Sequence, residues 1–288
     1  KSQKTIKMKA VKEIEEVSGR KDFILVATKA YDMPESCRRA LKFADSDTLF
    51  VAMQNGIPMD AMAKEVGDKR TVGCVIGYGA TMLEYGVLEV TSFGDYIIGM
   101  KENSPRLKEL KTALSTAFNT HISQNILSEL YSKLIVNSCI TALGVVSGLY
   151  LGEMLKIRHV REIFLKIMCE AVDVANALNL KLPPYAGKLD YYKMTDLSSS
   201  LKRMKAHLTI RVVGIKYRRL KSSSLQSLER GRKTEIDFFN GYIANKADEL
   251  NVPAPMNKAV TQMVKEIEDK KLKIQKANFY DKRIMDAI

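Results

Sequence analysis

Strand and helix patterns alternate in the first part of the chain. Apolar runs rich in strand-forming residues, DFILVAT (22–28) and DTLFVAM (47–53), are each followed by helical spacing, over 33–43 and 58–66, and TVGCVIGYGA (71–80) is a third strand pattern. Strands with continuous apolar runs are buried on both faces. This order therefore predicts a parallel sheet that is covered by helices on each side.

Two further elements are expected around these strands. Residues 7–17 have helical spacing, which predicts a helix ahead of the first strand. Residues 86–99 predict an antiparallel hairpin, with turn residues at Gly86 and at Gly94-Asp95.

Helical periodicity alone continues from about residue 124. The pattern divides the chain into an α/β part, residues 1–123, and an all-α part, residues 124–288. In open α/β sheets a ligand binds outside the carboxyl ends of the strands, here on the side of the helical part. The expected helices cover 124–150, 157–179, 194–218, 223–250 and 255–272.

The composition argues against several classes of protein. The net charge is +13, but the basic residues are interspersed with acidic ones and no zinc-finger or RNP pattern accompanies them, so a basic solvated surface is favoured over a nucleic-acid partner. The longest apolar stretch follows Lys133 and contains Asn137, Ser138 and Thr141, which predicts a buried helix and no membrane anchor. A cytoplasmic location is the default expectation, because no signal peptide is visible.

Four cysteines are far apart and form no C-x-x-C pair. Neither a metal centre nor a disulfide framework is therefore expected. The residues are Cys37, Cys74, Cys139 and Cys169.

Each expected parallel strand ends in a short polar or glycine-flanked segment. These are KAYD (29–32), QNG (54–56) and YGA (78–80). Strand ends are commonly exposed to solvent and rich in turns, so one such segment alone is weak evidence for a binding site. Three of them on successive strands favour a nucleotide-binding crevice.

Lys133 and Asn137 lie four residues apart, on one face of an apolar helix. One interpretation is a lysine that reaches solvent beside a satisfied core amide. The other is a desolvated lysine with a lowered pKa, which is a good general acid. Farther along, Ser222 begins a run of three serines that can cap a helix, and Glu235 is either a surface acid or a partner for Lys133.

Taken together, these segments resemble the ketopantoate reductase (2-dehydropantoate 2-reductase) family. Four landmarks occur in family order: TKAYD, QNG, SKLIVN and SSSLQSLERGRKTEIDFFNGY. The resemblance extends from about residue 20 to residue 265. It implies a partial Rossmann-type dinucleotide-binding domain, followed by a helical domain of the 6-phosphogluconate dehydrogenase-like kind.

The resemblance also implies an activity, NADPH-dependent reduction of 2-dehydropantoate to (R)-pantoate on the way to pantothenate and coenzyme A. Lys133 matches the proton donor of the family, and Glu235 matches a glutamate near the cofactor ribose and that lysine. No metal is implied, and the apolar helices leave room for a homodimer. The substrate contacts would be Lys133, Asn137, Ser223, Ser224 and Gln226, and the NADP(H) contacts Lys29, Asn55, Ala80 and Glu235.

The chain departs from the family pattern in two places. It contains no G-x-G-x-x-G, so the first βαβ unit of the fold is expected to be missing, and a chain that starts at Lys1 favours a fragment over a degenerate relative. Thr141 stands where many relatives have asparagine, and a further asparagine is replaced around Leu149 and Tyr150. Two alternatives therefore stay open: reduction of a different 2-oxo acid, or a truncated, non-catalytic binding or dimerisation relative.

Overall fold

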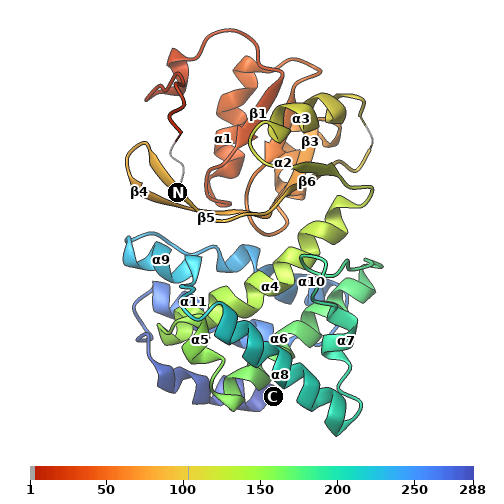
Figure 1. Cartoon of the computed structure of the whole chain (residues 1–288), viewed down its shortest axis with the longest axis vertical. Helices are drawn as coiled ribbons and strands as arrows, with labels where there is room; N and C mark the ends of the chain where they lie inside the picture. The colour runs from red at the N-terminus through yellow and green to blue at the C-terminus, as the bar shows by residue number, and fades with distance from the viewer. Residues whose placement is uncertain (1–3, 103) are drawn as a thin grey trace.

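The computed structural model describes residues 4–102 and 104–288 and has an α/β part stacked on a helical part (Figure 1). The α/β part is built on a five-stranded sheet in the order β1-β2-β3-β6-β7. Strands β1, β2 and β3 are parallel, β6 runs antiparallel to β3, and β7 is parallel to β6. The strands are β1 (Phe23–Val26), β2 (Leu49–Ala52), β3 (Thr71–Ile76), β6 (Tyr96–Gly99) and β7 (Thr120–Ile122).

Helices lie on both faces of this sheet, as the continuous apolar strands predict, although Leu25 of β1 stays 48% exposed. Along β2, Phe50 packs with α1 (Met33–Ala40) and α2 (Met59–Val66) on one face. Its neighbour Val51 packs on the other face, with α3 (Arg106–Ser115). Successive strand residues point to opposite faces, so β2 is buried along its whole length.

The hairpin expected over 86–99 is wrong, because its two strands do not pair with each other. The hairpin is formed by β4 (Gly79–Glu84) and β5 (Val87–Ser92), while β6 leaves it to pair with β3. Gly94 makes this possible, since a Cβ there would lie 2.2 Å from the carbonyl oxygen of Gly77. The second turn signal therefore marks a close approach of two backbones and not the end of a hairpin.

The helix expected over 7–17 is also wrong. The only regular structure there is the short 3-10 helix η1 (Ile14–Glu16). Met8 and Val11 are 81% and 37% exposed, and Ile14 is the residue of this segment that packs on the cluster around Met33. The first two turns of the expected helix therefore have no core to pack on. A short helix gains most of its stability from such packing, and without it the coil is preferred.

Most of the helices expected in the second part are confirmed, although the single helical period over 223–250 is broken. It contains α9 (Ser223–Glu229), the 3-10 helix η4 (Ile236–Phe238) and α10 (Asn240–Glu249). Gly231 breaks the period with a φ of +70°, after which the chain crosses toward the sheet. The other elements are α4 (Ile126–Ser147), α5 (Leu151–Met154), α6 (Arg158–Ala177), α7 (Tyr191–Thr195), α8 (Ser200–Lys216), α11 (Pro255–Glu268), η5 (Lys276–Tyr280) and α12 (Lys282–Ala287).

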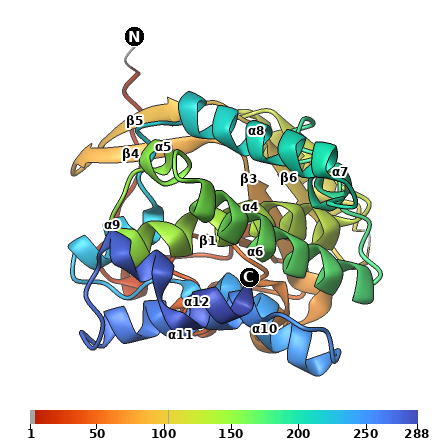
Figure 2. The same ribbon diagram turned by 90° about the horizontal axis from the view of Figure 1, so that it is seen from below.

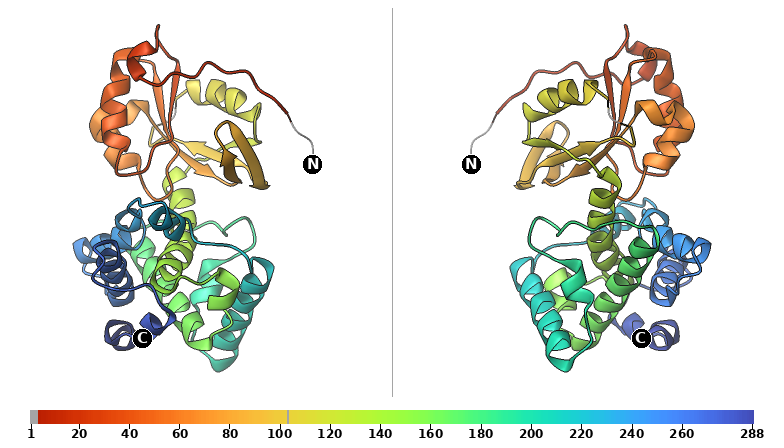
Figure 3. Two further views of the ribbon diagram at one scale, coloured as in Figure 1. Left: turned by 90° about the vertical axis from the view of Figure 1, so that its left-hand side faces the viewer. Right: turned by 90° about the vertical axis from the view of Figure 1, so that its right-hand side faces the viewer.

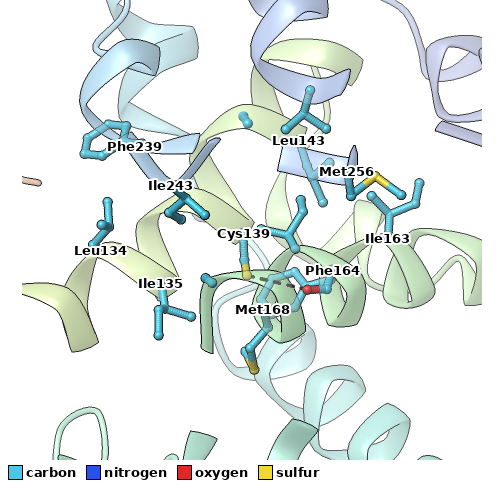
Figure 4. Packing of buried hydrophobic residues seen from close by; sticks show 14 of the residues in the cluster. Leu134, Ile135, Cys139, Leu143, Ile163, Phe164, Met168, Phe239, Ile243 and Met256 are labelled. Carbon is cyan, nitrogen blue, oxygen red and sulfur yellow. Dashed lines mark hydrogen bonds between the residues drawn. The ribbon is translucent and has the colours of Figure 1, made fainter. Parts of the chain in front are cut away.

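Helix α4 runs through the middle of the helical part, between α6, α9 and α11 (Figure 2). Its buried residues interlock with those of α6, α10 and α11 around Cys139, whose thiol donates to the carbonyl oxygen of Phe164 (Figure 4). By length and composition α4 could cross a membrane, but 78% of its most apolar window is buried inside the protein. The prediction of a buried core helix is therefore in accord with its surroundings.

A buried carboxylate joins two of the helices that enclose α4. Glu170 of α6 accepts hydrogen bonds from the backbone N–H groups of Met256 and Asn257, at 2.9 Å each. These N–H groups lie in the first turn of α11, where they have no partner within the helix. Burial raises the pKa of Glu170, and the hydrogen bonds from Met256 and Asn257 oppose that rise.

The two parts pack through the amino-terminal half of α4. A Cβ at Gly73 of β3 would lie 2.6 Å from the sulfur of Met59 and 2.9 Å from Ile126, so only glycine lets helix and strand approach this closely. One buried cluster accordingly contains Met59 and Val75 of the α/β part together with the core of the helical part. The β4–β5 hairpin projects on the same side of the molecule as α8 (Figures 2 and 3). The domain boundary at 123/124 stays a proposal, with α4 beginning at Ile126.

Candidate active site

The loop after β1 is tied to the helical part by Glu235, which immediately precedes η4. The Nζ of Lys29 lies 2.5 Å from Oε2 of Glu235, and the backbone N–H of Ala30 donates to Oε1 at 3.0 Å. Glu235 is only 8% exposed, whereas the side chain of Lys29 keeps 31% of its surface accessible. The carboxylate thus holds the lysine in place while leaving it open to a ligand.

The loop after β2 touches the same segment. Gln54 folds back on β1, donating from Nε2 to the carbonyl oxygens of Val26 and Thr28 at 2.9 and 3.0 Å. Gly56 has a φ of +89°, and a Cβ there would lie 2.6 Å from the carbonyl oxygen of Phe238. Between them Asn55 is partly exposed. The ends of β1 and β2 therefore lie against one short stretch around η4.

The end of β3 contacts Lys133 of α4. The Nζ of Lys133 donates to the carbonyl oxygen of Ile76 at 2.6 Å, and the residue is only partly exposed. Burial lowers the pKa of the Lys133 ammonium to about 8 from its ordinary value of 10.5. The neighbouring Cys74 thiol is itself buried, which raises its pKa to about 12 and keeps it neutral. No carboxylate is bonded to Lys133 within the described part of the chain.

The expected partnership between Lys133 and Glu235 is not what the structure contains. Each oxygen of Glu235 is bonded to the β1 loop, and Lys133 is bonded to β3. The reason is geometric: η4 crosses over the ends of β1 and β2, whereas α4 passes beneath the end of β3. Lys133 does not point to bulk solvent, however, because its ammonium is turned into the junction of the two parts.

Asn137 and Thr141 follow Lys133 along α4 at intervals of four residues. Asn137 is partly buried, and its side chain has no hydrogen bond within the described residues. Thr141 is buried and turns back on the helix, with Oγ1 donating to the carbonyl oxygen of Asn137 at 2.8 Å. Asn137 therefore keeps a free amide for a ligand, while the hydroxyl of Thr141 is used within the helix.

Helix α9 is fastened to α4 by Ser222. Its Oγ accepts from the N–H of Leu225 at 3.0 Å and donates to the carbonyl oxygen of Thr141 at 3.0 Å. Gly144 allows this contact, because a Cβ there would lie 2.4 Å from the Cβ of Ser222. The helix-capping role expected for the serine run is confirmed at Ser222. Its second role, as an anchor to α4, has no signal in the sequence.

The other predicted substrate contacts lie on α9, just beyond this anchor. Ser223 is exposed and Ser224 is buried. Gln226 donates from Nε2 to the carbonyl oxygen of Lys221 at 3.2 Å. The predicted cofactor contact Ala80 is exposed on β4, the strand that continues from the end of β3. Ser222 thus places α9 beside α4 at Thr141, one turn beyond Asn137, while Lys29 and Lys133 lie where the strand ends meet the helical part.

This junction fits part of a dinucleotide. Lys29 supplies a cation, and Asn55 a partly exposed amide, at the carboxyl ends of parallel strands. The sequence contains no G-x-G-x-x-G turn, so we assign no residue to the pyrophosphate. The structure holds no group of three or more His, Cys, Asp or Glu side chains, among the residues it describes, that could bind a metal ion.

Comparison with protein-family models identifies two matches in tandem. Residues 1–103 match the model described as "Ketopantoate reductase PanE/ApbA", and residues 125–268 match "Ketopantoate reductase PanE/ApbA C terminal". Curated relatives named 2-dehydropantoate 2-reductase include one from Pyrococcus horikoshii, 28% identical, with 85% of this chain and 75% of the relative covered. Another, from Aquifex aeolicus, is 24% identical, with 90% and 81% covered.

Solved structures with the same fold include a PanE/ApbA family ketopantoate reductase from Ralstonia eutropha. Its TM-score is 0.73 at 24% identity, with 87% of this chain and 76% of that chain covered. D-mandelate dehydrogenase with NADH and anilino(oxo)acetate has a TM-score of 0.73 at 22% identity, with 89% and 79% covered. The two family models together account for most of the sequence, and the fold is the one that the family has. The chain therefore belongs to the ketopantoate reductase PanE/ApbA family.

Proposed function

We propose that this protein reduces a 2-oxo acid with NADPH, and that the reaction is the conversion of 2-dehydropantoate to (R)-pantoate. The observation that carries the proposal is Lys133, a desolvated ammonium at the junction of the two parts with a pKa lowered to about 8. The names of the relatives from Pyrococcus horikoshii and Aquifex aeolicus support the substrate.

Lys133 acts as the general acid in this mechanism. The nicotinamide, when bound, supplies a hydride to the 2-oxo carbon. The ammonium of Lys133 then donates a proton to the oxygen that becomes the hydroxyl, and its charge stabilises that oxygen before the transfer. With a pKa of about 8 the group is still mostly protonated at neutral pH, yet it releases its proton more readily than an ordinary lysine.

The remaining residues bind and orient. We assign the carboxylate and hydroxyl ends of the substrate to the free amide of Asn137 and to the serine segment of α9, namely Ser223, Ser224 and Gln226. Lys29, Asn55 and Ala80 are assigned to NADP(H). Glu235 holds Lys29 in position through the ion pair of 2.5 Å. Correct alignment of reacting groups accounts for a large share of the rate in such a reaction.

A second candidate is the reduction of a different 2-oxo acid. Thr141 uses its hydroxyl within α4 and offers no amide to the substrate. A neighbour with the same fold, D-mandelate dehydrogenase, was solved with NADH and anilino(oxo)acetate, so the fold also binds a bulkier 2-oxo acid analogue. A panel of 2-oxo acids assayed against wild type and T141N separates the candidates. A gain in 2-dehydropantoate turnover in T141N, with loss of turnover of another acid, would favour the second.

The test of the proposed reaction compares two lysines. NADPH oxidation with 2-dehydropantoate is followed in wild type, in K133A and in K193A, whose side chain is 85% exposed on the surface. We expect kcat to fall by about 10²- to 10⁴-fold in K133A and to stay unchanged in K193A. Unchanged kcat in K133A would refute the assignment. Absence of saturable NADPH binding in a fluorescence titration of wild type would instead favour a non-catalytic binding or dimerisation relative.

We also propose that the enzyme is a cytoplasmic homodimer. One neighbour with the same fold is described as a dimeric ketopantoate reductase from Staphylococcus aureus. In the present chain, α8 exposes an apolar stripe at intervals of three and four residues, which an interface would cover. Light scattering on the purified protein measures the mass directly, and a monomer at all concentrations would refute the proposal. The stripe consists of Leu201, Met204, Leu208 and Val212.

A further inference from the structure

A hollow of about 420 Å³ lies between α5 and α8, away from the junction that carries Lys133. Four of its lining side chains are cations: Lys156, Arg211, Arg218 and Arg219. None of the four takes part in an ion pair within the part of the chain that the structure describes. The hollow therefore concentrates positive charge that the protein itself does not neutralise.

Glu153 contributes a carboxylate to the lining, and this carboxylate already accepts a hydrogen bond. Oε2 of Glu153 accepts from the backbone N–H of Tyr150 at 3.0 Å, as the return half of a capping box at the start of α5. One carboxylate set against four cations leaves the lining with a net charge of +3. The ring of Tyr150 lines the same hollow and supplies an apolar surface beside the charges.

A fifth cation, Arg161, is bonded to the backbone of Lys156, one of the lining residues. Arg161 donates from Nη1 to the carbonyl oxygens of Leu155 and Lys156 at 2.8 and 2.9 Å, while its buried Nε has no hydrogen-bond partner within the described residues. Burial, followed by the charges of Arg211 and Arg158, lowers the pKa of Arg161. Arg161 therefore places a further positive charge beside Lys156 of the lining.

The backbone that forms the hollow is closely packed. A Cβ at Gly152 would lie 2.7 Å from the Cα of Arg218, and one at Gly214 would lie 2.7 Å from the Cβ of Leu155. The N–H of Leu151 also donates to the carbonyl oxygen of Leu220 at 3.0 Å. The arginines therefore project from a backbone that is held in place, which lowers the entropic cost of fixing an anion between them.

We propose that this hollow binds the phosphate groups of a small polyanion. Guanidinium groups donate two parallel hydrogen bonds to phosphate oxygens, and Arg218 and Arg219 occupy adjacent positions just after the end of α8. The volume is within the range of small-molecule sites. The site is separate from the proposed reductase centre, so it stands or falls independently of Lys133.

The experiment is a calorimetric titration of the full chain with inorganic pyrophosphate, and with orthophosphate for comparison. R218Q/R219Q removes two cations from the hollow, and K205Q/K216Q removes two from exposed positions of α8 that do not line it. We expect saturable pyrophosphate binding that weakens by about tenfold for each guanidinium group removed in R218Q/R219Q and changes little in K205Q/K216Q. Thermal unfolding without ligand verifies that both variants fold.

Three outcomes would overturn the proposal. The first is absence of saturable binding by wild type, and the second is an equal loss of affinity in the two double variants, which would mean attraction to overall charge only. The third concerns the source of the phosphate. Suppose that wild type sediments with vesicles of phosphatidylglycerol, that R218Q/R219Q does not, and that neither protein binds pyrophosphate. The hollow then binds lipid headgroups and does not bind a soluble polyanion.

Discussion

Replacing Lys133 by methionine removes a charge that the fold keeps partly away from water. When folding lowers the pKa of a lysine, the folded state binds the proton less tightly than the unfolded state does. The contribution of such a group to stability is complete above the unfolded pKa and is lost as the pH falls through the folded pKa. In wild type the charge of Lys133 therefore lowers the free energy of unfolding below about pH 8. This destabilisation disappears as the pH rises toward 10.5.

The magnitude follows from the two pKa values. A fall from 10.5 to about 8 corresponds to about 3 kcal/mol of unfolding free energy at neutral pH, taking 1.36 kcal/mol for each pH unit. Methionine has a similar length and no charge, but it leaves the carbonyl oxygen of Ile76 without its donor, which costs about 1–2 kcal/mol. K133M should thus be more stable than wild type by about 1–2 kcal/mol at pH 7, and this advantage should vanish or reverse by pH 10.

The assay is chemical denaturation of wild type and K133M at a series of pH values from 6.5 to 10. All other groups titrate in both proteins, so the difference between the two unfolding free energies isolates position 133. K193M, at an exposed lysine, should show a difference that does not change over the same range. If the difference in unfolding free energy between K133M and wild type is equally independent of pH, the desolvation of Lys133 is refuted. The physical reason for choosing this lysine as the acid is refuted with it.

Three further predictions address the site. As the Lys133 ammonium loses its proton, kcat/KM should fall with rising pH above about 8, and a profile that stays level to pH 10 would contradict its role. E235Q should raise the KM for NADPH and lower the unfolding free energy by about 1 kcal/mol, because Lys29 loses its ion pair. An unchanged KM would show that this ion pair does not contribute to cofactor binding. G144A should displace Ser222 and α9, with a loss of about 1–3 kcal/mol in denaturant melts and a larger effect on the KM for the 2-oxo acid than on kcat. Equal KM values in G144A and wild type would show that α9 does not position the substrate.

Local patterns were sufficient for the elements that carry their own signal. The apolar runs of β1, β2 and β3 predicted a parallel sheet, and the long periods of α4 and α6 predicted core helices, because β2 and β3 are buried along nearly their whole length and both helices bury many apolar residues. The segment over 7–17 has helical spacing as well, yet only Ile14–Glu16 is helical, where Ile14 packs on the core, while Met8 and Val11 stay exposed. Periodicity therefore predicted structure best where the apolar face is buried in the core, although α8 is helical with an exposed apolar stripe.

The pairing of β6 was beyond the reach of local reasoning. Its position next to β3 depends on the close approach of Gly94 to Gly77, two residues separated by the whole β4–β5 hairpin. A glycine in a sequence signals freedom of the backbone without saying whether a turn or a neighbouring chain requires it. The same applies to Gly144, whose neighbour Ser222 comes from another helix.

The sequence by itself determined the family, the division into an α/β part and a helical part, and the positions of β1 to β3 and of the long helices, because these depend on residue types and spacings. Only the tertiary structure decided how these residues pair. Glu235 binds Lys29 and Ala30, and Lys133 binds Ile76, because η4 crosses the ends of β1 and β2 while α4 passes under the end of β3. The lowered pKa of Lys133 has the same origin, since desolvation comes from the packing of two parts that are far apart in the chain.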